Sequence, residues 1–260
     1  MILHRHESLL SQFVKARNVD VWLPEDYSEE KRYSVLYMHD GQNIVEAISS
    51  IGGVSWRIDQ AVERLGKDVI VVGVWNHGEI RWREYMPQQP FEAKSFDGIR
   101  GALRERMGGD AISDLYLRYV VEEVKPFIDK TYSTFTDKQH TFVMGSSMGG
   151  LISLYAICQY PDVFGGAGCV STHWSAGEFA IVEELAKRLP DPASHRLYFD
   201  YGTQGVDAPY EPFQLRFNEH LLAKGYEADK NWITLKFEGA DHNEAAWQAR
   251  VDTPLAFLFS

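Results

Sequence analysis

Two adjacent serines lie among glycines in the stretch HTFVMGSSMGGLISLYAICQY, which spans residues 140–160. Ser147 has one glycine two positions before it and another two positions after it, so residues 145–149 match the pattern G-x-S-x-G, whereas Ser146 is out of this frame. An apolar run precedes the pattern and a helical pattern follows it, which is the strand–turn–helix setting of a nucleophile elbow. Ser147 is therefore the candidate nucleophile.

The small residues around this serine have a steric reason. A serine at such an elbow has a strained backbone, and the strand and helix pass so close that side chains at Gly145 and Gly149 would clash. The N-terminus of the helix also points at the serine and stabilises an oxyanion there, which makes the amide of Met148 one expected donor. The second donor is expected after the strand SVLYM, in HDGQN, where Gly41 lets the chain present the amide of Gln42.

A serine hydroxyl needs a general base, and the base needs an orienting acid. In the chain order of this architecture, the acid follows a strand after the nucleophile, and the histidine follows the last strand. Asp207 lies beyond the strand run RLYFDYG, while its competitor Asp200 lies within that run. His242 lies beyond the run WITLKFEG, and His173, after another strand, is the alternative base. These positions predict a catalytic triad of Ser147, Asp207 and His242.

Strand and helix patterns alternate along the chain, and this alternation predicts how those residues are positioned. Six apolar, β-branched or aromatic runs read as strands, and most of them lack polar alternation, which suits strands covered on both faces. The stretches between them carry helical spacing. The strand runs are YSVLYMHD, DVIVVGVWN, HTFVMGS, GGAGCVST, HRLYFDYGT and NWITLKFEG. The helical stretches are residues 55–66, 112–132, 147–161, 178–190 and 211–225. The order predicts an α/β fold with a mostly parallel central sheet and helices on both faces.

Two further segments depart from this rhythm. Residues 11–27 alternate between polar and apolar side chains, which indicates an antiparallel edge strand or a hairpin. Residues 86–110 are rich in Gly, Pro and charge and have poor periodicity, so we expect a lid, a pocket wall or a solvated surface loop there. The histidines at positions 4 and 6 form an isolated pair at what reads as a mobile end. No metal site is expected, because no carboxylate or cysteine cluster lies nearby.

Composition narrows the classes of function. A chain of 260 residues with 45% hydrophobic residues is long enough for a single domain with one extensive core. The formal net charge of −11 argues against binding to nucleic acid, which needs clustered Lys and Arg. No secretory signal and no membrane-spanning run is apparent, so a cytoplasmic protein is expected. The two cysteines, Cys158 and Cys169, read as buried reduced thiols.

The motifs together resemble the putative esterase family of α/β-hydrolases, whose members include esterase D, enterochelin esterases, feruloyl and acetyl-xylan esterases, and mycolyltransferases. The resemblance is carried by VLYMHDGQN, SW, VIVVGVWN, RWREY, EEVKPFIDKTY, GSSMGG, DYGTQGVD and GADHNEAAW, between about Val35 and Trp247. It implies the α/β-hydrolase fold, the same triad with Asp207 rather than Asp200 as the acid, and no cofactor. It also implies that Asp40 borders the substrate.

The expected activity is that of a serine carboxylic-ester hydrolase acting through an acyl-enzyme on a small or sugar-linked ester. The alternatives are an acyltransferase that uses an alcohol or sugar acceptor, and a catalytically silent binding protein of the same fold. Several polar and aromatic residues are further candidates for contact with the substrate. They are His173, Trp174 and Tyr210, together with Trp75, Trp82 and Tyr85. The oligomeric state is not predicted.

Overall fold

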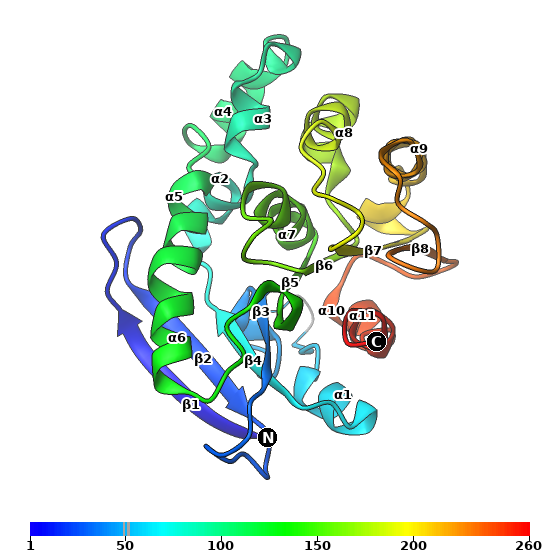
Figure 1. Ribbon diagram of the computed structural model, residues 1–260. Coiled ribbons are helices and arrows are strands. Elements are labelled where there is room, and N and C mark those ends of the chain that lie inside the picture. The colour runs from blue at the N-terminus through cyan, green and yellow to red at the C-terminus, as the bar shows by residue number, and fades with distance from the viewer. Residues whose placement is uncertain (49, 51–52) are drawn as a thin grey trace.

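The computed structural model of the protein describes residues 1–48, 50 and 53–260, and in this part of the chain eight strands form one sheet (Figure 1). The strands are β1 (Ile2–Leu9), β2 (Arg17–Leu23), β3 (Ser34–His39), β4 (Val69–Val74), β5 (Thr141–Ser146), β6 (Gly166–Val170), β7 (Arg196–Gly202) and β8 (Trp232–Phe237). They lie in the order β1-β2-β4-β3-β5-β6-β7-β8. β2 pairs antiparallel with both β1 and β4, and every pair from β4 through β3, β5, β6 and β7 to β8 is parallel. The predicted mostly parallel sheet is confirmed.

Helices cover both faces of this sheet. They are α1 (Ile58–Leu65), α2 (Arg81–Tyr85), α3 (Gln88–Glu92), α4 (Arg100–Met107), α5 (Ser113–Arg118), α6 (Lys125–Thr131), α7 (Met148–Gln159), α8 (Glu178–Ala186), α9 (Glu211–Lys224), α10 (Glu244–Gln248) and α11 (Asp252–Leu258). Short 3₁₀ turns are η1 (Gly41–Asn43), η2 (Gly78–Ile80), η3 (Lys94–Phe96), η5 (Lys138–His140), η6 (Trp174–Ala176) and η7 (Gly205–Asp207), and a π-helical turn, η4 (Tyr119–Val124), joins α5 to α6.

Alternate residues of the central strands face two separate apolar cores. In β3, Val35 and Tyr37 contribute to the larger core, whereas Leu36 and Met38 contribute to the smaller one. Figure 1 shows α5 to α9 on the side of the larger core, and α1 and α11 on the other side. Because both faces are covered, the parallel strands must be apolar on both faces. This explains the apolar runs without alternation in the sequence.

The N-terminal residues belong to a strand rather than to a mobile end. β1 lies at one edge of the sheet and forms an antiparallel hairpin with β2. β2 also pairs with β4, so the expected hairpin is present, but β2 is an inner strand and not an edge strand. His4 and His6, expected to be free, both face Tyr132, with the nearest ring nitrogen of His6 2.8 Å from its hydroxyl oxygen. Sequence patterns did not reveal β1 because most of its residues are exposed or half-buried, so burial imposes no apolar period on them.

The segment 86–110 is more ordered than its composition suggested. It contains α3, η3 and α4, and its apolar side chains, including Phe91 and Phe96, pack into the larger core. α3 has only five residues, and of the eight in α4 only Leu103 and Met107 are buried, so neither helix shows a clear apolar period in the sequence. The segment is a folded part of the protein, not a solvated loop.

The carboxyl ends of the parallel strands all lie on the same side of the molecule, and the candidate residues are in the segments that come after these ends. β3 is followed by Asp40 and β5 by Ser147, and the loops after β7 and β8 contain Asp207 and His242. Open α/β sheets bind their ligands at these carboxyl ends. None of the helices in the described part of the chain is long and apolar enough to cross a bilayer.

Candidate active site

Ser147 lies at a sharp turn between β5 and α7. Its backbone angles, φ 59° and ψ −124°, are rare for a residue with a side chain. A Cβ atom on Gly145 would lie 2.8 Å from the backbone of Gly149, so strand and helix touch there. A Cβ on Gly149 itself would lie 3.3 Å from Asp40 Oδ2, which is a tight contact rather than a clash. The steric argument therefore holds fully for Gly145 and less strictly for Gly149.

Asp207 and His242 are in direct contact. His242 Nδ1 lies 2.5 Å from Asp207 Oδ1, and the Asp207 side chain is fully buried. The amide of Gly202 donates to Asp207 Oδ2 at 2.7 Å. Burial by itself would raise the pKa of Asp207, but the hydrogen bond and charge of His242 hold that pKa below its ordinary value. An ionised Asp207 fixes the His242 ring with its proton on Nδ1.

A cavity of about 230 Å³ brings the candidate nucleophile and the candidate base together. Its lining residues are Asp40, Asn43, Trp56, Asn76, Arg81, Ser146, Ser147, His242, Glu244 and Trp247. Within the described part of the chain, no hydrogen bond joins the side chains of Ser147 and His242. Such bonds are often long without substrate and tighten when it binds, so the shared cavity is the relevant geometry.

The two predicted oxyanion donors lie on neighbouring segments. Met148 is the first residue of α7, whose first amides have no partner within the helix. Gln42 is in η1, which packs so closely against β4 that a Cβ on Gly41 would lie 2.4 Å from the carbonyl carbon of Gly73. A Cβ on Gly149 would lie 3.3 Å from Asp40 Oδ2, so the loop after β3 approaches the start of α7. Neither Gln42 nor Met148 is among the residues that line the cavity, and their role as oxyanion donors stays a prediction.

Asp40 lies in the cavity wall and is held by the cation of Arg81 and the amide side chain of Asn76. Arg81 donates from Nε and Nη2 to its two oxygens at 2.7 and 2.6 Å, and Asn76 Nδ2 donates at 2.7 Å. Burial would raise the pKa of Asp40, but the charge of Arg81 and these hydrogen bonds hold it below its ordinary value. Asp40 is an ionised acceptor beside the elbow, and its contact with the substrate stays a prediction of the resemblance.

His173, the alternative base, lies behind His242. The centroids of the two rings are 6.2 Å apart, and the hydroxyl oxygen of Tyr210 lies 2.5 Å from His173 Nδ1. Burial, with a contribution from the neighbouring His242, lowers the pKa of His173 to about 3, so its ring is neutral. Neither His173 nor Tyr210 lines the cavity, and in the described structure neither side chain is hydrogen-bonded to the carboxylate of Asp207. The amide of Tyr210 donates only to the backbone carbonyl of Asp207, at 2.9 Å. Their position supports the ring of His242 rather than the substrate.

The other predicted contact residues have structural partners. Trp174 is 1% exposed, packs on Phe199 and Phe217, and donates to Gln214, so it belongs to the core and not to the cavity. The expected contact between Trp174 and substrate is therefore corrected. Its side chain is buried because it lies between Phe199 of β7 and the α9 residues Phe217 and Gln214.

Three aromatic side chains near the site also lie outside the cavity lining. Trp75 donates to Asp20, and Tyr85 is buried with its hydroxyl oxygen 3.3 Å from the amide of Asp40. Trp82 packs between His173 and Arg106. Of the three, Tyr85 supports the Asp40 loop directly.

Six cavity residues were not singled out from the sequence. They are Asn43, Trp56, Asn76, Arg81, Glu244 and Trp247. All but Asn43 are inside or adjacent to the quoted motifs SW, VIVVGVWN, RWREY and GADHNEAAW, and Asn43 ends HDGQN. The signal was therefore present, but a polar residue in a motif does not reveal by itself that it faces a cavity.

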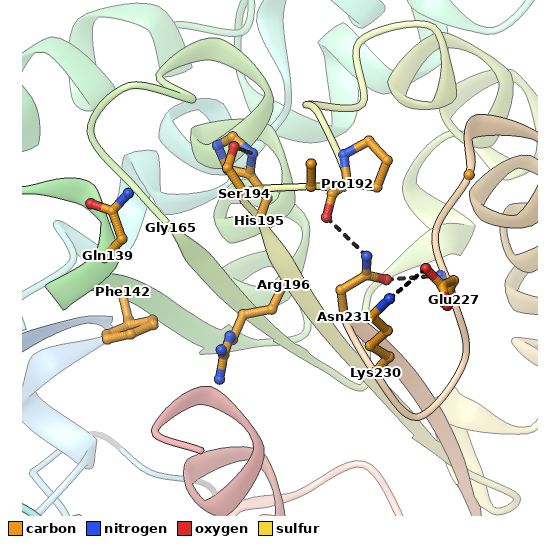
Figure 2. Close-up of a pocket in the computed structure, with 12 residues that line it drawn as sticks. Gln139, Phe142, Gly165, Pro192, Ser194, His195, Arg196, Glu227, Lys230 and Asn231 are labelled. Atoms are coloured by element: carbon orange, nitrogen blue, oxygen red, sulfur yellow. Dashed lines mark hydrogen bonds and ion pairs between the residues drawn. The ribbon is translucent and has the colours of Figure 1, made fainter.

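A larger cavity, of about 710 Å³, lies at the amino ends of β5, β6 and β7, opposite to the ends that the candidate residues follow (Figure 2). Its polar groups are already paired within the protein: Asn231 bridges Pro192 and Glu227, and Lys230 pairs with Glu227. His195 contacts the backbone carbonyls of Asp191 and Pro161. Ser194 Oγ lies 3.1 Å from His195 Nδ1 in this cavity, but the hydrogen bonds described for the His195 ring include none to a carboxylate. In the smaller cavity Asp207 holds the ring of His242, so the smaller cavity is the candidate active site.

The described residues include no group of three or more His, Cys, Asp or Glu side chains that could hold a metal ion. The ionisable groups of the cavity are instead paired with each other or with amide donors, as with Asp40 and Arg81. The arrangement offers a hydroxyl, a base and an anion-binding turn.

The fold is of the α/β-hydrolase type. Residues 11–258 match the family described as Putative esterase, and the chain belongs to that family. The resemblance found in the sequence is confirmed, and the family supports an esterase activity.

Individual relatives are distant. The uncharacterized protein YbbA of Bacillus subtilis (strain 168) is 24% identical over 258 residues, covering 94% of this chain and 92% of the relative. A ferulic acid esterase structure has a TM-score of 0.71 at 16% identity and covers 99% of this chain and 98% of its own. An IroE-like serine hydrolase from Shewanella oneidensis has a TM-score of 0.68 at 18% identity, covering 98% of this chain and 79% of its own. At such identities the structures show a common fold.

Proposed function

We propose that the protein is a serine carboxylic-ester hydrolase that works through an acyl-enzyme on Ser147. The observation that carries the proposal is the shared cavity of Ser147 and His242, with His242 held by Asp207 at 2.5 Å. A strained serine, a base and an orienting carboxylate are the three parts that acyl transfer from an ester requires. Membership of the esterase family supports the same reaction class.

The proposed first step is attack by Ser147 on the ester carbonyl. His242 Nε2 takes the proton of the hydroxyl, and Asp207 stabilises the imidazolium that forms. The amides of Met148 and Gln42 stabilise the oxyanion, and each such donor typically lowers the barrier by about 3 kcal/mol. The imidazolium then protonates the leaving alcohol. Water, activated by His242, hydrolyses the acyl-enzyme and releases the acid, with no cofactor.

The lining of the cavity supports a small ester with polar groups near the scissile bond. Asp40 and Asn76 present oxygen and nitrogen atoms on one side, and the Trp56 and Trp247 rings, 5.5 Å apart, form an apolar wall. At about 230 Å³ the cavity holds a short acyl or alcohol group rather than a long chain. A sugar-linked ester fits this mixture of polar and aromatic surface.

The proposal is tested with Ser147→Ala and a matched control, Ser146→Ala, which removes the neighbouring hydroxyl. On a short-chain p-nitrophenyl ester, Ser147→Ala should lower kcat by roughly 10⁴-fold or more, and Ser146→Ala should stay within about tenfold. A fluorophosphonate should label Ser147 in the wild type and in Ser146→Ala only, as read by peptide mass spectrometry. Activity of Ser147→Ala within tenfold of wild type would exclude the proposed nucleophile.

The same experiment separates the competing functions. A silent binding protein would neither turn over esters nor react with the fluorophosphonate. An acyltransferase would react, but in the presence of a sugar acceptor its product would be a new ester instead of the free acid. We expect the free acid to dominate with and without the acceptor.

A further inference from the structure

Ser171, the first residue after β6, lies buried directly behind Asp207. Its hydroxyl oxygen has three polar partners: Asp207 Oδ2 at 2.7 Å, Arg250 Nη2 at 2.8 Å and Trp247 Nε1 at 3.0 Å. The residue has no exposed surface, so bulk water does not compete for these contacts. Nothing in the sequence patterns singled out Ser171 or Arg250.

The chemistry of these partners determines the direction of each hydrogen bond. An indole N–H and a guanidinium can only donate. The two lone pairs of the Ser171 oxygen therefore accept from Trp247 and Arg250, and its single proton must point at Asp207. The hydroxyl of Ser171 is thus an obligatory donor to the carboxylate that orients the base.

The consequence reaches the imidazole. Asp207 Oδ2 accepts from Ser171 and from the amide of Gly202, which leaves Oδ1 for Nδ1 of His242 at 2.5 Å. With the proton of the ring on Nδ1, Nε2 is the atom free to accept the Ser147 proton. The hydroxyl of Ser171 therefore acts on the reaction only through Asp207.

Asp200, the competitor for the role of triad acid, holds this arrangement from behind. It accepts from Arg250 Nη2 at 3.0 Å and Nε at 3.2 Å, from the amide of Ser171 at 3.1 Å and from Tyr198 at 2.8 Å. The side chains of Asp200 and Arg250 are 0% and 4% exposed. Ser171 itself has a φ of 42°, which is unfavourable for a residue with a side chain and is maintained by these contacts.

We propose that Ser171 is a positioning residue for the proposed triad, fixed as a hydrogen-bond donor by Trp247 and Arg250, and that Asp200 serves the reaction by holding Arg250 and Ser171. The inference rests on the proposed function of Ser147, His242 and Asp207. Asp200, in β7, therefore has a supporting role in the reaction and not a direct one.

Removing the hydroxyl has a defined electrostatic effect. Asp207 would lose one of two donors on Oδ2, become more basic and attract the imidazolium of His242 more strongly. The acid limb of the kcat/KM profile reports the base, so it should move to higher pH. His242 also contacts, or shares the cavity with, several titratable, charged and aromatic groups that the substitution leaves in place. They are His173, Tyr210, Trp247, Asp241, Glu244, Asp40 and Arg81.

The test uses two substitutions that differ in backbone strain. Ser171→Ala and Ser171→Gly both remove the hydroxyl, but glycine accepts the positive φ without cost. Both should lower kcat by roughly 10- to 100-fold, the worth of a hydrogen bond to a charged group, with little change in KM. Thr172→Val is the matched control, because that neighbouring buried hydroxyl donates to the carbonyl of Cys169 instead.

Two further readouts separate positioning from a merely structural role. The downfield proton NMR signal of His242 Nδ1–H should shift in both Ser171 variants and remain in place in Thr172→Val. Fluorophosphonate labelling of Ser147 should slow in both Ser171 variants. If both keep the kcat, pH profile and NMR signal of the wild type, the inference on Ser171 is overturned. If the wild type is neither labelled nor active, the proposed function fails instead.

Discussion

Asp40 and Arg81 form an ion pair in the wall of the candidate active site, with two hydrogen bonds of 2.7 and 2.6 Å. The pair links the loop after β3, which carries the proposed oxyanion donor Gln42, to the start of α2. Side-chain exposures of 15% and 21% leave both charges largely dependent on each other. The pair therefore fixes a loop rather than merely adding surface charge.

Arg81→Gln should lower the free energy of unfolding at pH 7 by roughly 2–3 kcal/mol, because Asp40 is left as a partly buried carboxylate without its cation. The double variant Arg81→Gln/Asp40→Asn should recover part of that loss. Arg118→Gln is the control, since its pair with Glu122 is about 45% exposed on both sides and should cost no more than about 0.5 kcal/mol. Equal costs in urea denaturation would show that the buried pair has no special role.

Gly145→Ala should destabilise the protein by roughly 2 kcal/mol or more, since the new methyl group would meet the backbone of Gly149 at 2.8 Å. Ester turnover should fall as well, because the elbow would have to shift. Gly101→Ala is the counterpart within α4, where the added Cβ meets nothing within 4 Å. It should raise stability by up to about 1 kcal/mol. The steric account of the elbow fails if thermal unfolding does not separate the two variants.

His242→Gln and His173→Gln should have very different effects on kcat for a p-nitrophenyl ester. We expect a loss of roughly 10⁴-fold or more for His242→Gln, and of less than about tenfold for His173→Gln. The reason is that only His242 contacts Asp207 and lines the cavity with Ser147. Burial lowers the pKa of His173 to about 3, so it should not titrate in the pH profile. The reverse ranking would make His173 the base.

His39 should make the stability of the protein depend on pH. Burial lowers its pKa to about 4 in the folded protein, from 6.5 when unfolded, and its Nδ1 lies 2.7 Å from the hydroxyl oxygen of Tyr116. The folded state favours the neutral ring, so this contribution is complete above pH 6.5 and is lost as the pH falls from 6.5 to 4. Between pH 7 and pH 4, the wild type should lose roughly 3 kcal/mol more unfolding free energy than His39→Gln. Parallel pH dependences in chemical denaturation would contradict this.

Much of the fold could be predicted because it follows from local patterns. The parallel strands β3 to β7 are buried on both faces, whereas β8 at the edge of the sheet is mostly half-buried, and helical spacing marks α1, α7, α8 and α9. β1 escaped prediction because it is an outer strand with half-exposed residues, α3 because it has only five residues, and α4 because only Leu103 and Met107 among its residues are buried. Where burial does not impose a repeat, the sequence carries no signal of the element.

The candidate site divides in the same way. Chain order brought attention to Ser147, Asp207 and His242, and the structure brings Asp207 and His242 into contact. Trp174 had equal standing with other aromatic residues in the sequence, yet it lies in the core. A side chain that follows a strand end can point into the cavity or into the core, and the sequence around Trp174 does not show which.

The sequence by itself determined the elbow, the alternation of strands and helices and the family, because steric needs and hydrophobic periods act between residues close in the chain. Only the tertiary structure decided which polar groups surround the elbow. Arg81 reaches Asp40 across 41 positions and Arg250 reaches Ser171 across 79, and no local pattern records such a meeting. These contacts arise where separate strands end at one edge of the sheet, and there the properties of Ser147 depend on residues drawn from most of the chain.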